Sequence, residues 1–493
     1  MPLRFPYLEK VVMIRWAGGH NIPEMRSRGG GGMNDFWRGF AVTLPAMIIV
    51  AVLTALFARN LIKKIFGSVL RLILTETYSK NLMEIISSGR RFHTQNIVEM
   101  ALRSETDQAI RRSLGTPYPA KGWDRVMFLP AQLAVMPSKE HVKIDTRTVI
   151  GPRAPRPLKL EIPLLVGGLG PGPTLSEPMK EALAKGSRAA GTATHTGEGA
   201  LTEAERREAD KVVVQYGRAD WNRPPETLGQ ADMIEIVAGS GATSGTPFTI
   251  PKVPGTMRQL LGLNPGESLE IRSRVPGVNR PEDWRELVAR LQEVGKGVPV
   301  GIKLVPSRIE ADLARALDAG VDFITIDGAG SGVRESAPIL QDDFGLPAIR
   351  GLVRAVRFLE KHVARHRVSL IVSGGLTTPG DYLKALALGA DAVALDLPLV
   401  MGAVHTQITK VLPWEPPSGL IWYDGKFADR LDVDQAAESV SNLFKSSVEE
   451  MKLATIALGK KALREVNRDD LTALDPLARE MTGLPLAYEA QPR

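Results

Sequence analysis

One long apolar run near the amino-terminal end stands apart from the rest of the chain. Residues 40–58 read FAVTLPAMIIVAVLTALFA, with no charge between Arg38 and Arg59. The run matches the apolar core of a bilayer in length and has no polar face, so it predicts a transmembrane helix. A signal peptide is disfavoured because Lys63 and Lys64 follow the run instead of a small-residue cleavage site. A buried core helix is the other alternative.

The basic flank of this helix predicts its orientation. Positive charges gather over Arg59–Arg71, and such flanks face the cytoplasm. We therefore expect a single-pass protein of the cell membrane with a cytoplasmic catalytic domain. Residues 1–39, which include Gly29–Gly32, are expected to form a disordered tail, and the polar helical pattern over 59–155 predicts a linker or cap.

Beyond Pro155, short apolar runs alternate with amphipathic stretches. Runs without apolar–polar alternation indicate strands covered on both faces, and helices between them indicate parallel crossovers. The runs are Leu160–Val166, Val212–Gln215, Met233–Ile236, Val298–Val305, Phe323–Asp327, Val368–Ser373 and Ala392–Leu395. Their number approaches eight over roughly 250 residues, the usual size of a barrel. We predict an α/β fold: a (β/α)8 TIM barrel over 156–412, with a lid loop and a helical extension over 413–493. A doubly wound open sheet is the alternative.

Composition and charge narrow the chemistry. The chain has 493 residues, with 62 Lys and Arg against 55 Asp and Glu. The net charge of +7 is mild for this length and does not predict a nucleic-acid partner. The chain has no cysteine, which excludes disulfides, thiolate zinc sites, cysteine nucleophiles and cysteine-ligated iron–sulfur clusters within it. No metal site is predicted.

Paired glycines follow the apolar run Val368–Ser373. The run ends in Ser373; Gly374 and Gly375 come next, and Pro379 begins the next helix. Paired glycines let backbone amides approach an anion, and a helix start adds its positive end, so the loop predicts a phosphate cradle. The alternative is a tight strand-to-helix turn that needs glycine only for its dihedral angles. Gly389, just before the last of the runs, favours the phosphate interpretation.

Three polar residues are candidates for binding or catalysis. Lys303 interrupts an apolar run, and its inward burial is costly unless it meets an anion, either a ligand or a carboxylate such as Asp327 or Glu235. Gln215 ends its own run and either bonds a ligand or fills a layer of the barrel. Glu198 either orients a substrate and acts as a base, or caps the helix that follows.

These residues, in this order, resemble the FMN-binding domain of glutamate synthases in its short, membrane-linked form. The resemblance extends from about Tyr78 to Tyr488. The matching segments are THTGEGAL at 194–201, MIEI at 233–236, IKLV at 302–305, FITIDG at 323–328, GLPAIRGL at 345–352, SGGLTTPGDYLKALALGADAV at 373–393 and EEMKLATIALGKKALREVNRDDLTALD at 449–475.

The resemblance implies a barrel that holds FMN and passes electrons to an imine. In the family this imine forms from 2-oxoglutarate and ammonia, and its reduction gives L-glutamate. The positions that match FMN contacts are Gln215, Lys303, Gly328, Ser373, Gly374, Gly375 and Gly389. Lys303 and Glu198 are the expected catalytic residues.

The chain departs from the family at three places. The family usually carries cysteines for a 3Fe-4S cluster after the eighth strand, so this chain, which lacks cysteine, needs an external electron carrier. Residues 239–244 replace a basic loop suited to a keto-diacid. Asp396 stands where the family has a small hydrogen-bond donor facing the phosphate, and a carboxylate there would repel the phosphate by roughly a few kcal/mol.

These observations predict a membrane-anchored FMN oxidoreductase of glutamate-synthase type acting on a small-molecule imine. The alternative is a degenerate barrel that serves as a membrane-bound binding or assembly subunit. A third hypothesis keeps FMN but changes the substrate, with Trp414, Trp422 and Tyr423 as an aromatic lid. The helical region 434–465 either offers a homo-oligomer face or packs on the barrel.

Overall fold

The structure is a computed structural model with two units, residues 1–98 and 99–493. The residues it describes are 32–77, 81, 83–112, 114–118, 122–169, 174–239, 245–250, 253, 255–330 and 336–489. Two of the sequence-based predictions fall partly outside them: the amino-terminal tail up to residue 31, and the substituted loop at 240–244.

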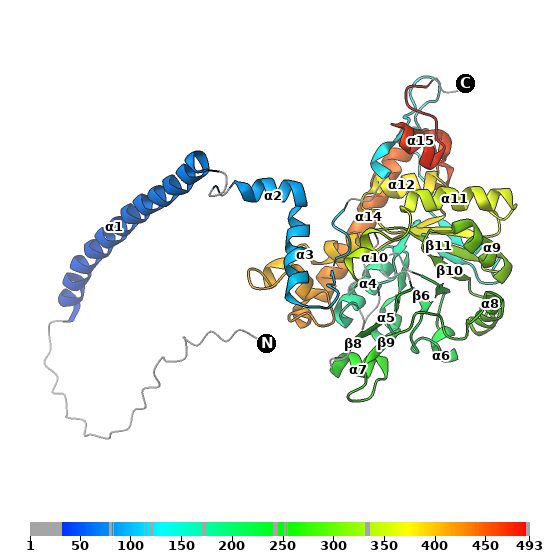
Figure 1. Cartoon of the computed structure of the whole chain (residues 1–493), viewed down its shortest axis with the longest axis horizontal. Coiled ribbons are helices and arrows are strands. Elements are labelled where there is room, and N and C mark those ends of the chain that lie inside the picture. Colours follow the sequence, from blue (N-terminus) through cyan, green and yellow to red (C-terminus); the bar gives the residue numbers. More distant parts are fainter. Residues whose placement is uncertain are drawn as a thin grey trace. The chain divides into compact units, whose positions relative to one another are not determined.

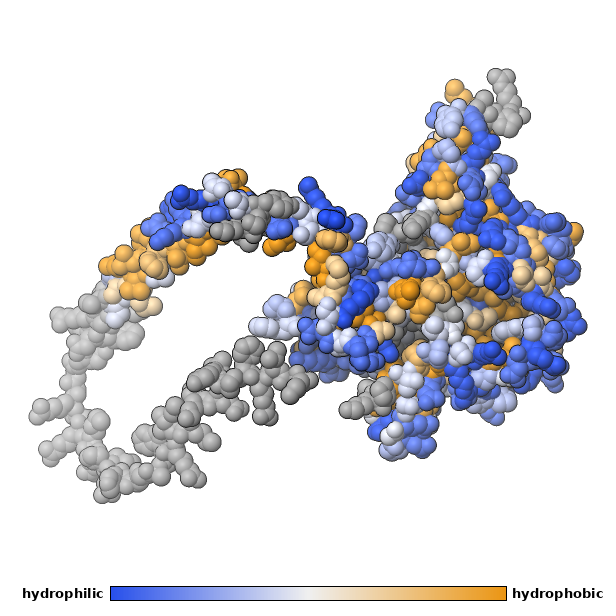
Figure 2. All heavy atoms as spheres, in the orientation of Figure 1, coloured by the Kyte–Doolittle hydropathy of each residue, from blue (hydrophilic) through white to orange (hydrophobic). Residues whose placement is uncertain are grey.

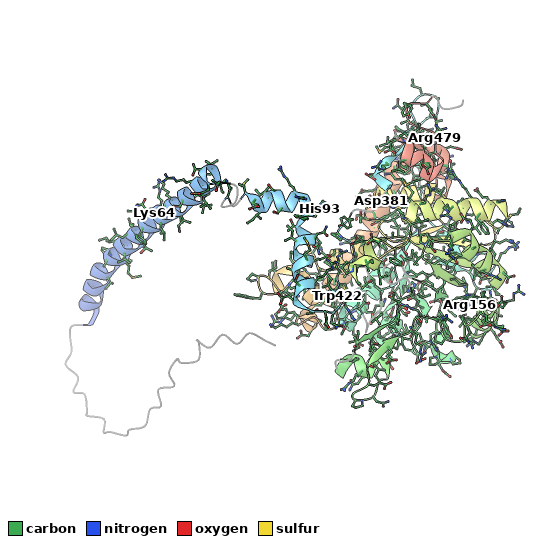
Figure 3. All side chains as sticks on the ribbon, viewed as in Figure 1. Lys64, His93, Arg156, Asp381, Trp422 and Arg479 are labelled. Carbon is green, nitrogen blue, oxygen red and sulfur yellow. The ribbon has the colours of Figure 1, made fainter. Side chains whose placement is uncertain are left out.

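A single long helix, α1 (Gly32–Thr75), dominates the first unit. The helix begins within the predicted tail 1–39 and continues past residue 58, where the transmembrane segment was predicted to end. Within its stretch Thr43–Thr75 an 18-residue window has a mean hydropathy of 1.9 and exposed side chains, so by length and composition the stretch is a candidate membrane span. Figure 2 shows hydrophobic residues along this helix and hydrophilic ones toward its C-terminal part, where Figure 3 labels Lys64.

Eight parallel strands form the centre of the second unit. The strands, in spatial order, are β4 (Leu164–Val166), β13 (Ala392–Leu395), β12 (Ser369–Ser373), β11 (Phe323–Asp327), β10 (Val300–Leu304), β7 (Met233–Val237), β6 (Lys211–Tyr216) and β5 (Ala193–His195). β4 and β5 contact each other, although no ladder pairing joins them among the described residues. The sheet is thus a nearly closed barrel, as the apolar runs predicted.

Helices on the outside of the strands complete the βα units. They are α4 (Glu177–Ala189), α5 (Glu203–Glu208), α6 (Pro225–Leu228), α8 (Asp283–Val294), α9 (Ile309–Ala319), α10 (Pro338–Asp342), α11 (Ala348–Lys361), α12 (Pro379–Ala387) and α13 (Leu397–Val404). Figure 1 shows α8, α9, α11 and α12 on the outer side of the strands. Their apolar faces and the outward side chains of the strands form the largest core cluster.

The second unit has further elements outside the βα units. They are α7 (Gly255–Leu261), α14 (Val433–Ala457), α15 (Pro476–Thr482) and three antiparallel pairs, β1 (Val126–Phe128) with β14 (Leu471–Ala473), β2 (Thr148–Ile150) with β3 (Leu158–Leu160), and β8 (Phe248–Ile250) with β9 (Leu269–Ile271). Helix α2 (Glu84–Phe92) belongs to the first unit, and α3 (Thr94–Glu105) crosses the boundary at residue 98.

Apolar side chains fill the amino-terminal half of the barrel interior. Ile150 and Leu160 of the β2–β3 pair share a buried cluster with Leu165, Val213 and Phe323 from the strands. Because this end is filled by apolar groups, the polar inward-facing residues gather at the carboxyl ends of the strands, where barrels of this kind place their sites.

The long C-terminal helix α14 packs on the barrel's own helix α4. A Cβ on Gly186 of α4 would lie 2.6 Å from Cγ1 of Val440, so the two helices approach closely. This contact accounts for the apolar face of α14 within one chain.

The buried side chain of Arg112 holds the segment that precedes the barrel against α10 through Asp342. Nε of Arg112 donates to Glu99 at 2.5 Å, and its two terminal nitrogens donate to the carboxylate of Asp342 at 2.6 and 2.8 Å. Part of the predicted linker is therefore packed on the barrel and continuous with it.

Candidate functional site

A buried carboxylate at the barrel mouth contacts side chains from three other strands, β5, β6 and β11. Glu235 on β7 is 2 % exposed. Its Oε1 accepts a hydrogen bond from Nε2 of Gln215 at 2.7 Å and lies 3.0 Å from Nε2 of His195, while its Oε2 accepts from Thr325 at 2.6 Å. Burial works to raise the pKa of Glu235, but the positive charge of Lys303 and these hydrogen bonds hold it well below its usual range.

The ionised carboxylate determines how two neighbours are oriented. His195 accepts a hydrogen bond at Nδ1 from the amide of Gly197 at 2.9 Å, so the proton of its neutral ring is on Nε2 and faces Glu235. Burial lowers the pKa of His195, which favours this neutral form. Gln215 must turn its NH2 group to Glu235, and this leaves its carbonyl oxygen as a free acceptor within the part of the chain the structure describes.

Lys303 reaches the same end of the barrel from β10. Its Nζ lies 3.6 Å from Oδ2 of Asp327, and Oδ1 of Asp327 accepts a hydrogen bond from Ser373 at 2.7 Å. Burial works against the charge, but Asp327, Glu235 and Asp396 raise the pKa of Lys303 above its usual value. The ion pair expected as one alternative is present, yet at 3.6 Å it leaves ammonium protons for a further acceptor.

The backbone directly after β4 passes close to Lys303 and Gln215 because residues 167 and 168 are glycines. A Cβ on Gly168 would lie 3.1 Å from Nζ of Lys303 and 3.4 Å from Nε2 of Gln215. A Cβ on Gly167 would lie only 1.9 Å from Oδ1 of Asp396. The lysine and the amide thus share one compact space at the barrel mouth, as expected if both contact one ligand.

The paired glycines after β12 form a turn that only glycine adopts without strain. Gly374 and Gly375 have φ of 88° and 76°, and a Cβ on Gly374 would lie 2.5 Å from the carbonyl oxygen of Gly328. The amides of both glycines donate to no other backbone group in the described part of the chain. The tight turn is therefore confirmed, and the phosphate cradle stays a prediction that these amides are compatible with.

A pocket of about 440 Å³ lies beside this turn. Gly374 and Gly375 line it with Asp396 from the end of β13, and Thr116 and Tyr118 line it from the segment that precedes the barrel. The sequence did not predict this last wall, because its residues lie far from the barrel strands in the chain.

The start of α12 contributes less to this pocket than expected. Oδ2 of Asp381 accepts hydrogen bonds from the amides of Thr377 and Thr378, both at 3.1 Å (Figure 3 labels Asp381). The amides that would meet an anion are therefore occupied by the helix's own capping residue.

Asp396 is half-buried, and its carboxylate has no hydrogen-bond partner within the described residues. Burial raises its pKa to about 7; Asp327 and Glu235 act in the same direction, and Lys303 opposes them. Near neutral pH this carboxyl group is thus present in both protonation states.

Of two further predicted site residues, Gly389 lies away from the barrel mouth, and Glu198, whose charge acts on Lys303, is engaged by an arginine. Gly389 precedes β13, which runs parallel to β12, so it lies at the opposite end of the barrel from the turn after β12. The prediction that it binds the phosphate is therefore wrong, and its φ of 105° beside Val356 explains the glycine. Glu198 accepts hydrogen bonds from Nε and Nη2 of the buried Arg218 at 3.0 and 3.2 Å, which favours a structural role over that of a base.

The aromatic residues of the expected lid have different surroundings. Trp422 is 4 % exposed and belongs to the core, where it bridges to Leu175, whereas Trp414 is 85 % exposed. Figure 3 labels Trp422 within this segment. Trp422 therefore holds the segment in place, as the packing alternative expected, and Tyr423 packs on a small cluster with Phe248.

Comparison with known proteins agrees with this architecture. A family model described as the conserved region in glutamate synthase matches residues 93–461. A glutamate synthase large subunit-like protein of Rhizobium meliloti is 31% identical over 397 residues, covering 76% of this chain and 90% of that protein. An archaeal-type glutamate synthase (NADPH) of Thermotoga maritima is 27% identical over 432 residues, covering 80% of this chain and 84% of that protein. A flavocytochrome b2 mutant with pyruvate bound matches with a TM-score of 0.49 and 17% identity, covering 76% of this chain and 84% of that chain.

Proposed function

The chain belongs to the glutamate synthase family, and on this basis we propose that it is a membrane-anchored, FMN-dependent oxidoreductase that reduces an imine. The observation that carries the proposal is the placement of Lys303 and Gln215 together at the barrel mouth, beside a glycine turn with free amides. A cation and an amide acceptor suit the pyrimidine edge of a flavin, and free amides suit its phosphate.

The residues present fit FMN at the ring end of the site. Lys303 would supply positive charge, Gln215 would supply a carbonyl acceptor, and Gly374 with Gly375 would supply amide donors. FMN, when bound, supplies the two-electron carrier for reduction of a C=N bond. Glu235 holds Gln215 and His195 in the orientation this requires.

The substrate we propose is the imine of 2-oxoglutarate and ammonia, or a related imine. Its formation releases water, and addition of a hydride to its carbon and a proton to its nitrogen gives the amine. Because the chain has no cysteine, its electrons must come from an external carrier and not from a cluster of its own. In this proposal Glu198 is a positioning residue, because its hydrogen bonds from Arg218 hold the loop after β5.

Helix α1 is the proposed anchor. The stretch Thr43–Thr75 has 33 residues, about 50 Å at 1.5 Å per residue, whereas a bilayer core is about 30 Å thick. We propose that the uncharged residues 40–58 span the bilayer and that the basic part from Arg59 emerges into the cytoplasm. A reporter fused to the C-terminus should give a cytoplasmic signal, and a signal from the other side would overturn the orientation.

Asp396 favours one second candidate. A carboxylate beside the phosphate end would suit a barrel that has lost catalysis and serves as a binding or assembly subunit of a membrane complex. Turnover distinguishes the two functions. In an enzyme, photoreduced bound flavin should be reoxidised by 2-oxoglutarate with ammonia. Flavin that is bound but is not reoxidised by these substrates would favour the binding or assembly subunit.

The absorption spectrum of the full-length protein in detergent tests the cofactor. We expect flavin bands as isolated or after incubation with FMN. Lys303→Met should weaken FMN binding by about tenfold or more, as expected for loss of a buried charge at a ligand. Lys159→Met, which removes an exposed lysine from β3, should leave binding unchanged. A colourless protein that takes up neither FMN nor riboflavin would refute the proposal.

A further inference from the structure

The pocket beside the glycine turn has acidic walls. Asp124, Asp381 and Asp396 line it, and no lysine or arginine does so among the residues that the structure describes around it. Asp381 is occupied in capping α12, and Asp124 is exposed to solvent. Asp396 alone among the three is half-buried with a carboxylate that has no hydrogen-bond partner in the described part of the chain.

The position of Asp396 is determined by its surroundings. It follows β13 and precedes α13, and its Oδ1 occupies the space that a side chain at residue 167 would need. Gly167 is therefore matched to Asp396. The residue lines the pocket, and the charges of Lys303 on β10, Asp327 on β11 and Glu235 on β7 all act on its carboxylate.

We propose that Asp396 makes this barrel sensitive to the charge on the tail of its flavin, so that a phosphate-bearing flavin binds only with Asp396 protonated. The inference rests on the proposed flavin site. A protonated carboxyl group can donate a hydrogen bond to a phosphate oxygen, whereas an ionised one repels it. A flavin without phosphate meets no such repulsion.

Because protonation of Asp396 and binding of FMN are thermodynamically linked, the affinity for FMN should depend on pH. If binding of FMN takes up one proton at Asp396, the Kd for FMN rises about tenfold per pH unit once the group is ionised in the free protein. Partial burial and the neighbouring carboxylates place that ionisation near neutral pH. The phosphate of FMN also loses a proton near pH 6, and this effect is common to every variant.

The test is a fluorescence titration of the full-length, flavin-free protein in detergent with FMN and with riboflavin from about pH 6 to about pH 9. In the wild type the ratio of the Kd for FMN to that for riboflavin should rise at least about tenfold over this range. Asp396→Asn should reduce the rise to about threefold or less and should bind FMN more tightly than the wild type at the upper end. Asp396→Ser serves the same purpose if the amide variant does not fold.

Asp124→Asn is the matched control, because it removes a charge from the same wall at an exposed position; it should keep the wild-type rise. The inference would be overturned if the ratio of the Kd for FMN to that for riboflavin stayed constant with pH in the wild type, or if it rose equally in Asp396→Asn. Binding of riboflavin in the same experiment would still support the flavin site. Failure of both flavins to bind at every pH would instead refute the proposed function itself, and the inference with it.

Discussion

At the scale of single residues, the site depends on one carboxylate that satisfies several donors. Glu235 accepts from Gln215 and Thr325 and faces the Nε2 proton of His195, and each of these residues is buried. A buried donor without its acceptor is costly, so the network couples four strands, β5, β6, β7 and β11, through a single side chain.

Glu235→Gln should lower the free energy of unfolding by about 2 to 4 kcal/mol, because the amide offers one acceptor where three donors converge and removes a charge that faces Lys303. Chemical denaturation measures this change. Glu161→Gln, at an exposed carboxylate, should change stability by less than about 0.5 kcal/mol. Equal effects of the two substitutions would show that the network contributes little.

Asp396 should make stability depend on pH with a definite sign. Its folded-state pKa of about 7 lies above the unfolded value, so the folded protein keeps the proton longer than the unfolded chain does. The stability it contributes is complete below about pH 4 and is lost as pH rises through about 7. The difference in unfolding free energy between Asp396→Asn and wild type, measured by denaturation from about pH 5 to about pH 9, should therefore shift in favour of the variant as pH rises. A pH-independent difference would contradict the assignment.

Sequence alone could name several of these residues but not their contacts. Lys303 and Glu235 are visible as charges within apolar runs, and a carboxylate was one of the two partners, beside a ligand, considered for Lys303. The hydrogen bonds to His195 and Thr325 depend on the register of the five strands from β5 to β11 in the sheet, which no local pattern contains. The pairing of Glu198 with Arg218 joins residues twenty positions apart and was missed for the same reason.

At the scale of elements, the turn after β12 is the most constrained piece of backbone in the site. Gly374 has a positive φ, and its α-carbon faces the carbonyl oxygen of Gly328. Neither feature can be relieved by a side-chain rotation, because both partners are backbone.

Gly374→Ala should lower the free energy of unfolding by roughly 2 kcal/mol or more, from the left-handed backbone and the 2.5 Å approach together. Gly380→Ala is the control: this glycine lies in the first turn of α12, and its nearest neighbour would be 3.7 Å from the new Cβ. It should be neutral or stabilising by up to about 1 kcal/mol. Thermal or chemical unfolding compares the two, and similar losses would refute the role of the turn.

The elements were predictable where their pattern was strong. Continuous apolar runs identified seven of the barrel strands, because both faces of a parallel strand are buried. β5 was missed because Ala193–His195 is short and carries a polar and a titratable residue. Gly389 was misplaced because closeness in sequence hid the fact that residues before and after parallel strands lie at opposite ends of the barrel.

At the scale of the whole molecule, the chain combines a bare apolar helix with a compact barrel. The side chains of α1 over Thr43–Thr75 are exposed, and in water so much apolar surface would favour association or a membrane. The two units thus differ in the solvent they require.

Val50→Lys together with Leu53→Lys should move the protein from the membrane pellet to the soluble fraction, because each lysine near the centre of a span costs about 2.5 to 3.5 kcal/mol. Carbonate extraction of membranes and immunoblotting measure the distribution. Leu133→Lys, at a residue of the second unit that is 92 % exposed, should leave it unchanged. A wild-type protein that is fully soluble, or a double variant that still pellets, would argue against the anchor.

The contacts of Arg112 with Glu99 and Asp342 determine where the chain can be truncated for work in solution. A fragment that starts at residue 156, where the strand pattern begins, would discard Thr116 and Tyr118 together with one wall of the acidic pocket. A fragment that starts at α3 keeps Glu99 and Arg112, and with them the tie to Asp342. The shorter fragment would lack one wall of the pocket, so ligand affinities measured on it would not represent those of the whole protein. Assays and crystals should therefore use the longer fragment.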